Sequence, residues 1–379
     1  MKRAIVTTTI NVPHNLTAYC DDIVKHEHDD VAVIVAGDRK TKSEAAAFCA
    51  DLAACSGVNV IYFGVEEQNR FLAQVPEYGR FLPWDCIQRR NVALLKAYSE
   101  GAETIFTIDD DNFLHTPDYI GSHGKLGEMQ TLQTFQSSSG WLDVCSFLKE
   151  SRGRSFFHRG YSYNQRLAPR PEIKRQHVSG RIVVNAGLWL GDPDVDAVTR
   201  LAIAPDVVAC DIDTNIALMR GTIAPFNSQN TALIRDVIPA YCMHVGIGRY
   251  DDIIPSYFVK RIADHLMDYL SFGMPLVRQE RNAHDLWVDA DKERVGYQLV
   301  DRIVEWLYEI DLKGRDYRSC MEELLPEFRE KSLGAKGLSA EQTQFLAMID
   351  QNYRAWLAVI DQIDASSYEW AEHSRAAAL

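Results

Sequence analysis

The first third of the chain alternates between short runs of apolar, β-branched residues and longer segments whose apolar residues recur at helical spacing. The short runs predict strands, and the segments between them predict helices. Because strands that alternate with helices form parallel sheets, this pattern predicts an α/β fold with a Rossmann-like, mostly parallel sheet flanked by helices. The predicted strands are Ala4–Ile10, Val31–Ala36, Val58–Phe63 and Thr104–Ile108, and the predicted helices are Asn15–His26, Ser43–Ala54 and Cys86–Ser99.

The pattern is less regular between residues 115 and 250. Gly, Ser, Pro and basic residues gather at Ser151–Arg181, ahead of a strand-like run at Ile182–Leu190. We expect long loops over the sheet in this region. A helix is then predicted from near Pro255 through Leu270, because proline is favoured in the first helical turn, and it should end before Gly273.

From about residue 292 onward the pattern is almost entirely helical, with predicted helices at 293–311, 316–330 and 339–363. No linker or repeat marks a boundary, so we predict a core over residues 1–291 and a helical region over residues 292–379 packed on it. The apolar residues of these helices, Trp306 and Trp356 among them, could form an interface in a homo-oligomer, but packing against the core is favoured.

The net charge of the chain limits the kinds of binding partner to be expected. The 379 residues include 40 Lys and Arg against 53 Asp and Glu, a formal net charge of −13. Such a chain has no overall positive field for a phosphate backbone, so no nucleic acid partner is expected. An anionic ligand would need a local group of basic residues or a metal ion. No apolar stretch approaches the roughly 18 residues that span a bilayer, and the first residues lack the features of a signal peptide. We therefore expect a cytoplasmic protein.

The strongest chemical signal is a run of three carboxylates, Asp109, Asp110 and Asp111, directly after the predicted strand Thr104–Ile108. Ligands of open parallel sheets bind beyond the carboxyl ends of the strands. Neighbouring like charges are costly unless a cation neutralises them, and Mg²⁺ or Mn²⁺ is commonly shared between carboxylates and substrate phosphates. We therefore predict that Asp109 and Asp111 bind a metal beside a phosphate; a solvated acidic turn is the alternative.

Charged residues elsewhere offer further candidates. Arg90 precedes the same strand and could pair with a phosphate or with Asp109. Before the Pro255 helix, Arg249 supplies positive charge, and Asp251 or Asp252 could accept a proton from an attacking hydroxyl as general base. The alternative for Asp252 is simple capping of the helix N-terminus.

Three segments together resemble the reversibly glycosylated polypeptides, also called UDP-arabinopyranose mutases, and their bacterial glycosyltransferase-like relatives. They are Arg90–Asp111, Asn185–Ala197 and Gly248–Asp252, and the resemblance covers roughly residues 1–290. It implies a GT-A-like nucleotide-sugar-binding fold over residues 1–291. It also implies that the D-x-D carboxylates Asp109, Asp110 and Asp111 hold Mn²⁺ or Mg²⁺ against the diphosphate of a UDP-sugar.

The same resemblance suggests roles for four more residues. Tyr161–Arg166 partly matches a family stretch whose arginine is linked to reversible self-glycosylation, so Arg166 is a predicted substrate-site residue. Asn185, which opens the second matching segment, is expected at the substrate. Plant relatives carry a histidine suited to the metal shell where this chain has Gln279, and His284 could replace it as a metal ligand or a phosphate contact.

Together these features predict a metal-dependent glycosyltransferase that moves a sugar from a nucleotide-sugar, expected to be UDP-linked, to a hydroxyl-bearing small-molecule or glycan acceptor. One alternative is a UDP-sugar mutase that interconverts pyranose and furanose forms without an acceptor. Another is a non-catalytic nucleotide-sugar-binding protein. A nucleotidyltransferase also uses paired carboxylates and a metal, but it would release pyrophosphate.

Overall fold

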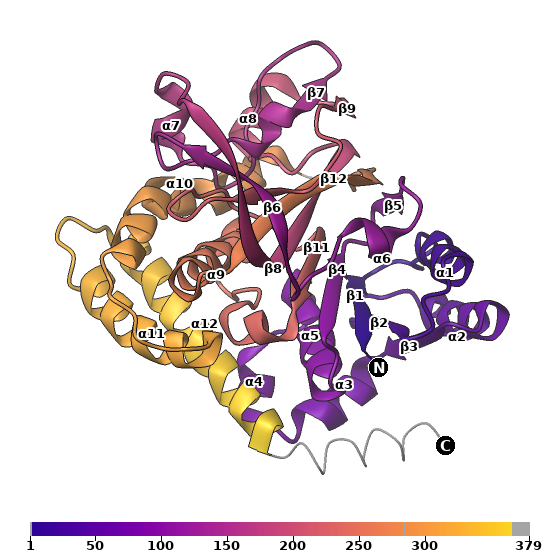
Figure 1. Cartoon of the computed structure of the whole chain (residues 1–379). Coiled ribbons are helices and arrows are strands. Elements are labelled where there is room, and N and C mark those ends of the chain that lie inside the picture. The colour runs from indigo at the N-terminus through magenta and orange to yellow at the C-terminus, as the bar shows by residue number, and fades with distance from the viewer. Residues whose placement is uncertain (1, 283–284, 366–379) are drawn as a thin grey trace.

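The computed structural model describes residues 2–282 and 285–365. In this part of the chain twelve strands form one sheet, in the order β3-β2-β1-β4-β11-β8-β6-β10-β12-β5, with β7 and β9 attached beside β8 (Figure 1). The first four strands in sequence are β1 (Arg3–Thr9), β2 (Val31–Gly37), β3 (Asn59–Phe63) and β4 (Thr104–Ile108). They pair in parallel, so the predicted α/β class and these four strands are confirmed.

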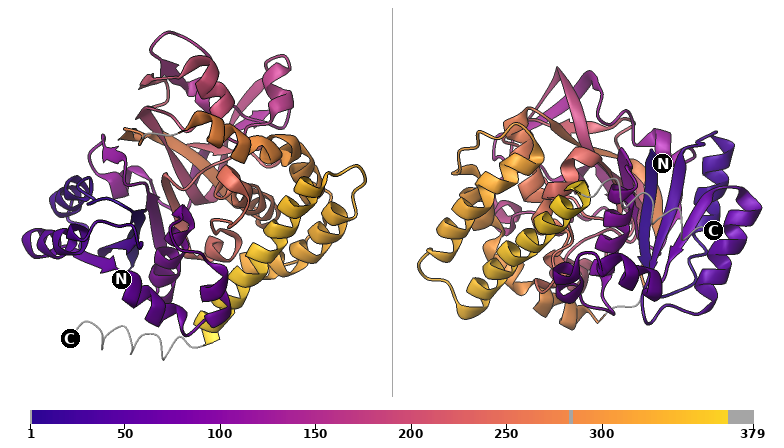
Figure 2. Two further views of the ribbon diagram at one scale, coloured as in Figure 1. Left: turned by 180° about the vertical axis from the view of Figure 1, so that it is seen from behind. Right: turned by 90° about the horizontal axis from the view of Figure 1, so that it is seen from below.

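The connections of this parallel unit place its helices on both faces of the sheet. The helices α1 (Leu16–Lys25) and α2 (Glu44–Ser56) follow β1 and β2, whereas α5 (Arg90–Ser99) leads into β4 on the far side of β1. Right-handed crossovers put α5 on the face opposite to α1 and α2, as the two views of Figure 2 show. The strand order reverses at β1, and such a switch point opens a crevice at the carboxyl ends of the strands.

The middle of the chain differs from the predicted long loops. It contains β6 (Met129–Ser137), β8 (Ile173–Gly191) and β11 (Asn230–Ile234). The short strand β11 runs antiparallel between β4 and β8, and β6 pairs with the first half of β8. The first half of β8 is polar and largely exposed, so its sequence has no apolar strand pattern. Its strand structure depends on the pairing with β6, which a local pattern does not reveal.

Short elements fill the connections between these strands. They are α3 (Val65–Leu72), α4 (Pro76–Phe81), β5 (Asn112–Leu114), α6 (Tyr119–Ser122), β7 (Leu148–Glu150), α7 (Tyr163–Leu167), α8 (Ala197–Ile203), β9 (Val207–Cys210) and β10 (Ile216–Leu218).

The helix predicted through Leu270 is wrong at its C-terminal end. The helix α9 (Ile253–Leu266) ends where Met267 adopts a positive φ of 64°, and β12 (Tyr269–Gln279) begins two residues later. The apolar run after Met267 fits either a helix or a buried strand by periodicity alone. Because β12 pairs with β5 through Gln279 and Asn112, its end lies beside the carboxylates that follow β4.

The predicted C-terminal helices are confirmed as α10 (Leu286–Tyr308), α11 (Tyr317–Leu333) and α12 (Ala340–Ala365). They cover one side of the molecule, away from α1 and α2 (Figures 1 and 2). α12 contacts α4, α5 and the turn at Arg235–Ala240, and Trp356 is fully buried there. The helices thus share one continuous hydrophobic core with the sheet.

Candidate active site

A cavity of about 590 Å³ opens at the carboxyl end of β4, at the switch point of the sheet. Its wall is formed by the loop before α5, the carboxylates after β4, the segment before α9, the end of β12 and the start of α10. The charged side chains among the lining residues are Asp85, Arg90, Asp109, Asp110, Asp111, Arg159, Asp194, Arg249, Asp251, Asp252, Arg281, Asp289 and Lys292. The cavity therefore brings together seven of the residues singled out in the sequence: Arg90, Asp109, Asp110, Asp111, Arg249, Asp251 and Asp252.

The three carboxylates after β4 have different environments. Asp109 forms an ion pair with Arg90, and Asp110 accepts a hydrogen bond from the Thr9 hydroxyl at 2.6 Å. Asp111 has one buried oxygen, Oδ1, with no hydrogen-bond partner in the described chain. Burial, and then the negative charges of Asp109 and Asp110, raise the pKa of Asp111 to about 7. Oδ2 accepts a long hydrogen bond from the Asn282 backbone amide at 3.4 Å, so Oδ1 is the oxygen suited to a cation that enters with the ligand.

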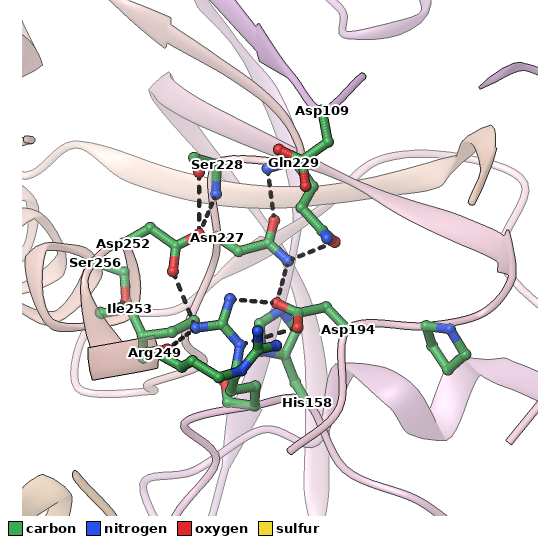
Figure 3. A network of polar contacts seen from close by, with 12 residues as sticks. Asp109, His158, Asp194, Asn227, Ser228, Gln229, Arg249, Asp252, Ile253 and Ser256 are labelled. Atoms are coloured by element: carbon green, nitrogen blue, oxygen red, sulfur yellow. Dashed lines mark hydrogen bonds and ion pairs between the residues drawn. The ribbon is translucent and has the colours of Figure 1, made fainter. Parts of the chain in front are cut away.

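Arg90 connects the carboxylates to the opposite wall of the cavity. Its side chain is fully buried and donates to the carbonyl oxygen and the hydroxyl of Ser228, at 2.9 and 2.7 Å. The backbone amide and hydroxyl of Ser228 in turn donate to Asp252 Oδ2 at 2.9 and 3.0 Å (Figure 3). Of the two partners predicted for Arg90, the structure shows Asp109.

A buried ion pair joins Arg159 to Asp194, whose carboxylate is labelled in Figure 3. Arg159 Nε and Nη2 each donate to one Asp194 oxygen at 2.9 Å, and Arg159 Nη1 lies 3.1 Å from Asp252 Oδ1. Burial alone would raise the pKa of Asp194, but the adjacent Arg159 guanidinium holds that pKa well below its usual range. The pair fixes the floor of the cavity as a rigid, charged surface.

Asp251 and Asp252 divide two roles between them. Asp252 occupies the cap position of α9 but makes no capping hydrogen bond with its side chain, which engages Ser228 and Arg159 instead. The capping alternative is therefore wrong. Asp251 accepts a hydrogen bond from Gln88 Nε2 at 2.7 Å, and burial followed by repulsion from Asp252 raises its pKa to about 7. A carboxyl group with this pKa can take and return a proton near neutral pH.

Two arginines supply positive charge at the rim. Arg249 donates from Nε to Glu293 at 2.8 Å and lies 3.6 Å from Asp289, both on α10. Arg281 follows β12 and is largely buried, but Nε and Nη2 make no hydrogen bond to any described group. Its two carboxylate neighbours, Asp192 and Asp194, are each 3.7 Å away. Arg281 is thus available to an anionic ligand.

The possible metal ligands are few. Among residues 2–282 and 285–365, no group of three or more His, Cys, Asp or Glu side chains could hold a metal by itself. Gln279 lines the cavity, and its buried Oε1 also lacks a hydrogen-bond partner within the described chain. A metal here would depend on Asp109 and Asp111, with Gln279 or ligand oxygens completing its shell. His284 lies outside the described residues.

Arg166 and Asn185 do not line the cavity. Arg166 on α7 lies 2.5 Å from Asp196, and its guanidinium packs over the Phe157 ring. Asn185, fully buried in β8, contacts a His123 ring nitrogen at 3.0 Å and accepts from Ser271 at 2.6 Å.

The sequence reasoning did not single out Asp194, Ser228 or Arg281 as site residues. Asp194 falls within the segment Asn185–Ala197 that carried the family resemblance, which was the one available signal for it. Ser228 and Arg281 lie in short loops without a motif. The helices of the described chain include none that is both long and apolar enough to cross a bilayer.

Comparisons with known proteins agree with the resemblance. The profile of the family described as "Reversibly glycosylated polypeptide" matches residues 152–364. UDP-arabinopyranose mutase 2 of Arabidopsis thaliana is 30% identical over 237 residues, which are 60% of this chain and 61% of that protein, less than two thirds of its length. UDP-arabinopyranose mutase 1 of Oryza sativa subsp. japonica is 26% identical over 273 residues, 69% of each chain.

Two solved structures also resemble the chain. One is glucosyl-3-phosphoglycerate synthase from Mycobacterium tuberculosis in complex with Mg²⁺ and UDP, with a TM-score of 0.35, 11% identity, and coverage of 81% of this chain and 78% of that one. The other is a mannosyltransferase from Pyrobaculum calidifontis in complex with GDP-Man and Mn²⁺, with a TM-score of 0.34, 9% identity, and coverage of 100% and 79%. Because the family profile covers more than half of the 379 residues, the chain belongs to the reversibly glycosylated polypeptide family.

Proposed function

We propose that this protein is a UDP-sugar mutase, which changes the ring size of a sugar while the sugar remains linked to UDP. The relatives named above are UDP-arabinopyranose mutases, so they favour the mutase over the glycosyltransferase predicted from the sequence. The observation that carries the proposal is the cavity itself. It combines polar atoms that have no hydrogen bond among the described residues, and that suit a metal and a diphosphate, with a buried carboxyl group that suits proton transfer.

The diphosphate end of the cavity is formed by Asp111, Gln279 and Arg281. Asp111 Oδ1 and Gln279 Oε1, which make no hydrogen bond with residues 2–282 or 285–365, suit a hard cation such as Mn²⁺ or Mg²⁺, and Asp109 is the second carboxylate at the same strand end. Such an ion supplies Lewis-acid stabilisation of the charge on a departing diphosphate. The Arg281 guanidinium, whose Nε and Nη2 make no hydrogen bond within the described chain, would offset the remaining phosphate charge.

The proton end is formed by Asp251. In a ring contraction, a sugar hydroxyl attacks C1 as the C1–diphosphate bond breaks, and the attacking hydroxyl loses its proton. The diphosphate then returns to C1, the bond from C1 to the former ring oxygen breaks, and that oxygen takes up a proton. Asp251, with a pKa of about 7, can accept the first proton and donate the second, so no external acceptor is needed.

The test is incubation of the purified protein with Mn²⁺ and a panel of UDP-sugars, followed by chromatographic separation with mass detection. We expect one UDP-sugar to yield an isomer of unchanged mass, and Asp111→Ala to lose this conversion. Asp361→Ala, which removes an exposed carboxylate on α12, is the matched control and should retain it. Release of free UDP would indicate a transferase instead, and tight UDP binding without any conversion would indicate a non-catalytic binding protein.

A further inference from the structure

One wall of the cavity is the segment Met243–Asp252, which contains a short 3-10 helix at Gly248–Tyr250 and contacts two helices from distant parts of the chain. This segment contributes Met243, Gly246 and Gly248 to the lining in addition to the charged residues already described. At Met243 and Val245 the backbone amide and carbonyl groups make, within the described chain, no backbone hydrogen bonds of the kind found in a sheet or a helix. Two buried asparagines satisfy them instead.

Asn352 on α12 holds Val245. Its Oδ1 accepts from the Val245 backbone amide at 2.6 Å, and its Nδ2 donates to the Val245 carbonyl at 2.9 Å and to the Met348 carbonyl at 2.7 Å. The side chain is only 3% exposed. Asn91 on α5 holds Met243 in the same two-way manner, at 2.8 Å to its amide and 2.7 Å to its carbonyl.

Gly246 in this segment also packs closely against α12. Gly246 adopts a positive φ of 81°, and a Cβ atom added there would lie 2.9 Å from the terminal carbon of Met348. The segment therefore packs closely against the Met348 side chain of α12, and the positive φ at this position favours glycine. α12 thus supplies hydrogen bonds at Val245 and packing at Gly246, in the middle of the wall.

A shift at Val245 would reach the proton-transfer group. The His244 backbone amide donates to the Asp251 carbonyl at 2.8 Å, so the segment closes on itself between these two residues. A movement of the residues that Asn352 contacts would be transmitted to the Asp251 backbone through this hydrogen bond, while Gln88 contacts the Asp251 side chain at 2.7 Å. Displacement of a reacting group by about 1 Å can lower a rate by about a hundredfold.

We propose that Asn352 is a positioning residue: it anchors the cavity wall from the C-terminal helical region and thereby places Asp251 for proton transfer. This role rests on the proposed mutase function. It assigns to the C-terminal helices a part in the reaction, although Asn352 itself does not line the cavity.

The test compares Asn352→Ala with Tyr353→Phe in the full chain. Tyr353→Phe also removes one hydrogen bond from α12, to the Ala240 carbonyl at 3.1 Å, but that carbonyl lies before the wall segment. We expect Asn352→Ala to lower kcat about tenfold or more with KM changed less than about twofold. Amide hydrogen exchange should become faster within residues 243–252. Tyr353→Phe should retain the wild-type kcat.

Three outcomes are decisive. An unchanged kcat in Asn352→Ala, with active wild-type protein, overturns the positioning role alone. Equal losses of kcat in both variants, in proportion to their melting temperatures, overturn it as well, because the effect would then be one of stability. If the wild-type protein converts no UDP-sugar, the proposed function has failed and the positioning role falls with it. Asn352→Ser, which keeps one hydrogen-bonding group, replaces Asn352→Ala if that variant does not fold.

Discussion

Replacement of Arg159 tests how the floor of the cavity is stabilised. The Arg159 guanidinium is enclosed between Asp194 and Asp252, and its side chain is 6% exposed. In Arg159→Met, both carboxylates lose their main positive partner, although Asp252 keeps its hydrogen bonds from Ser228 and Asp194 keeps one from Asn227 at 2.7 Å. The folded protein must then hold unpaired negative charge in its interior, which is strongly unfavourable.

The size of the expected loss in the free energy of unfolding follows from the burial of this ion pair. Removal of one partner from a buried ion pair costs about 3–5 kcal/mol in the free energy of unfolding. At about 1.4 kcal/mol per factor of ten, this lowers the folding equilibrium constant by about a hundredfold to several thousandfold. Without the Arg159 guanidinium, which lowers the pKa of Asp194, burial should raise that pKa above its ordinary value. The loss of stability is therefore greatest at high pH and shrinks as the pH falls, because the folded variant takes up a proton at Asp194.

The assay is urea-induced unfolding at pH 8 and pH 5. Arg318→Met is the matched control, since Arg318 makes the same two-bond contact with Asp361, at 2.9 and 2.6 Å, on the exposed surface. We expect the control to lose less than about 1 kcal/mol. Adding Asp194→Asn to Arg159→Met should restore about 1–3 kcal/mol at pH 8. A loss from Arg159→Met no larger than that of the control, or one independent of pH, would refute this reasoning.

Three further expectations concern Asp251 and Gly248. The rate of conversion by the wild-type protein should rise with pH through about 7 as Asp251 loses its proton. The pH–rate profile of Asp251→Asn should lack this rise, and an unaltered rise would assign the titration to another group. The folded protein holds the Asp251 proton up to about pH 7, whereas the unfolded chain releases it at lower pH, so the free energy of unfolding should fall as the pH rises over this interval. Urea unfolding of Asp251→Asn at several pH values should show a weaker dependence of this free energy on pH, and an equal dependence would contradict the assignment. In urea unfolding, Gly248→Ala should destabilise the protein more than Gly57→Ala. Both glycines have a positive φ, but of the two only Gly248 would bring the new Cβ against a backbone oxygen, that of Lys292, at 2.2 Å. Equal losses of stability would show that the loop relaxes freely.

The sequence was sufficient for features that depend on local pattern. The buried strands β1, β2 and β4 are runs of apolar residues with clear ends, and the carboxylates at Asp109 follow directly from one of them. Because parallel strands end at one edge of a sheet, the placement of a charged site there needed no knowledge of long-range contacts. Asp109 was one of the two partners predicted for Arg90, and the structure shows this ion pair.

Features that depend on contacts between residues far apart in the chain were not visible in the sequence. The strand β11 is five residues long and is defined by its neighbours β4 and β8, which lie far from it in the chain. The contact of Arg159 with Asp194 joins residues 35 positions apart in irregular loops, where charge alone does not identify a partner. Arg166 lies in the same basic segment, Ser151–Arg181, as Arg159, yet it forms an ion pair with Asp196 outside the cavity.

The measurement that tests the proposed mutase most directly is equilibration from both directions. The purified protein with Mn²⁺ is given either the pyranose or the furanose form of the UDP-sugar that it converts, without any acceptor. The proposal predicts that both reactions reach the same ratio of the two forms, that no free UDP accumulates, and that Asp111→Ala abolishes the exchange. Release of UDP in proportion to the sugar consumed, with no second UDP-sugar formed, would contradict it.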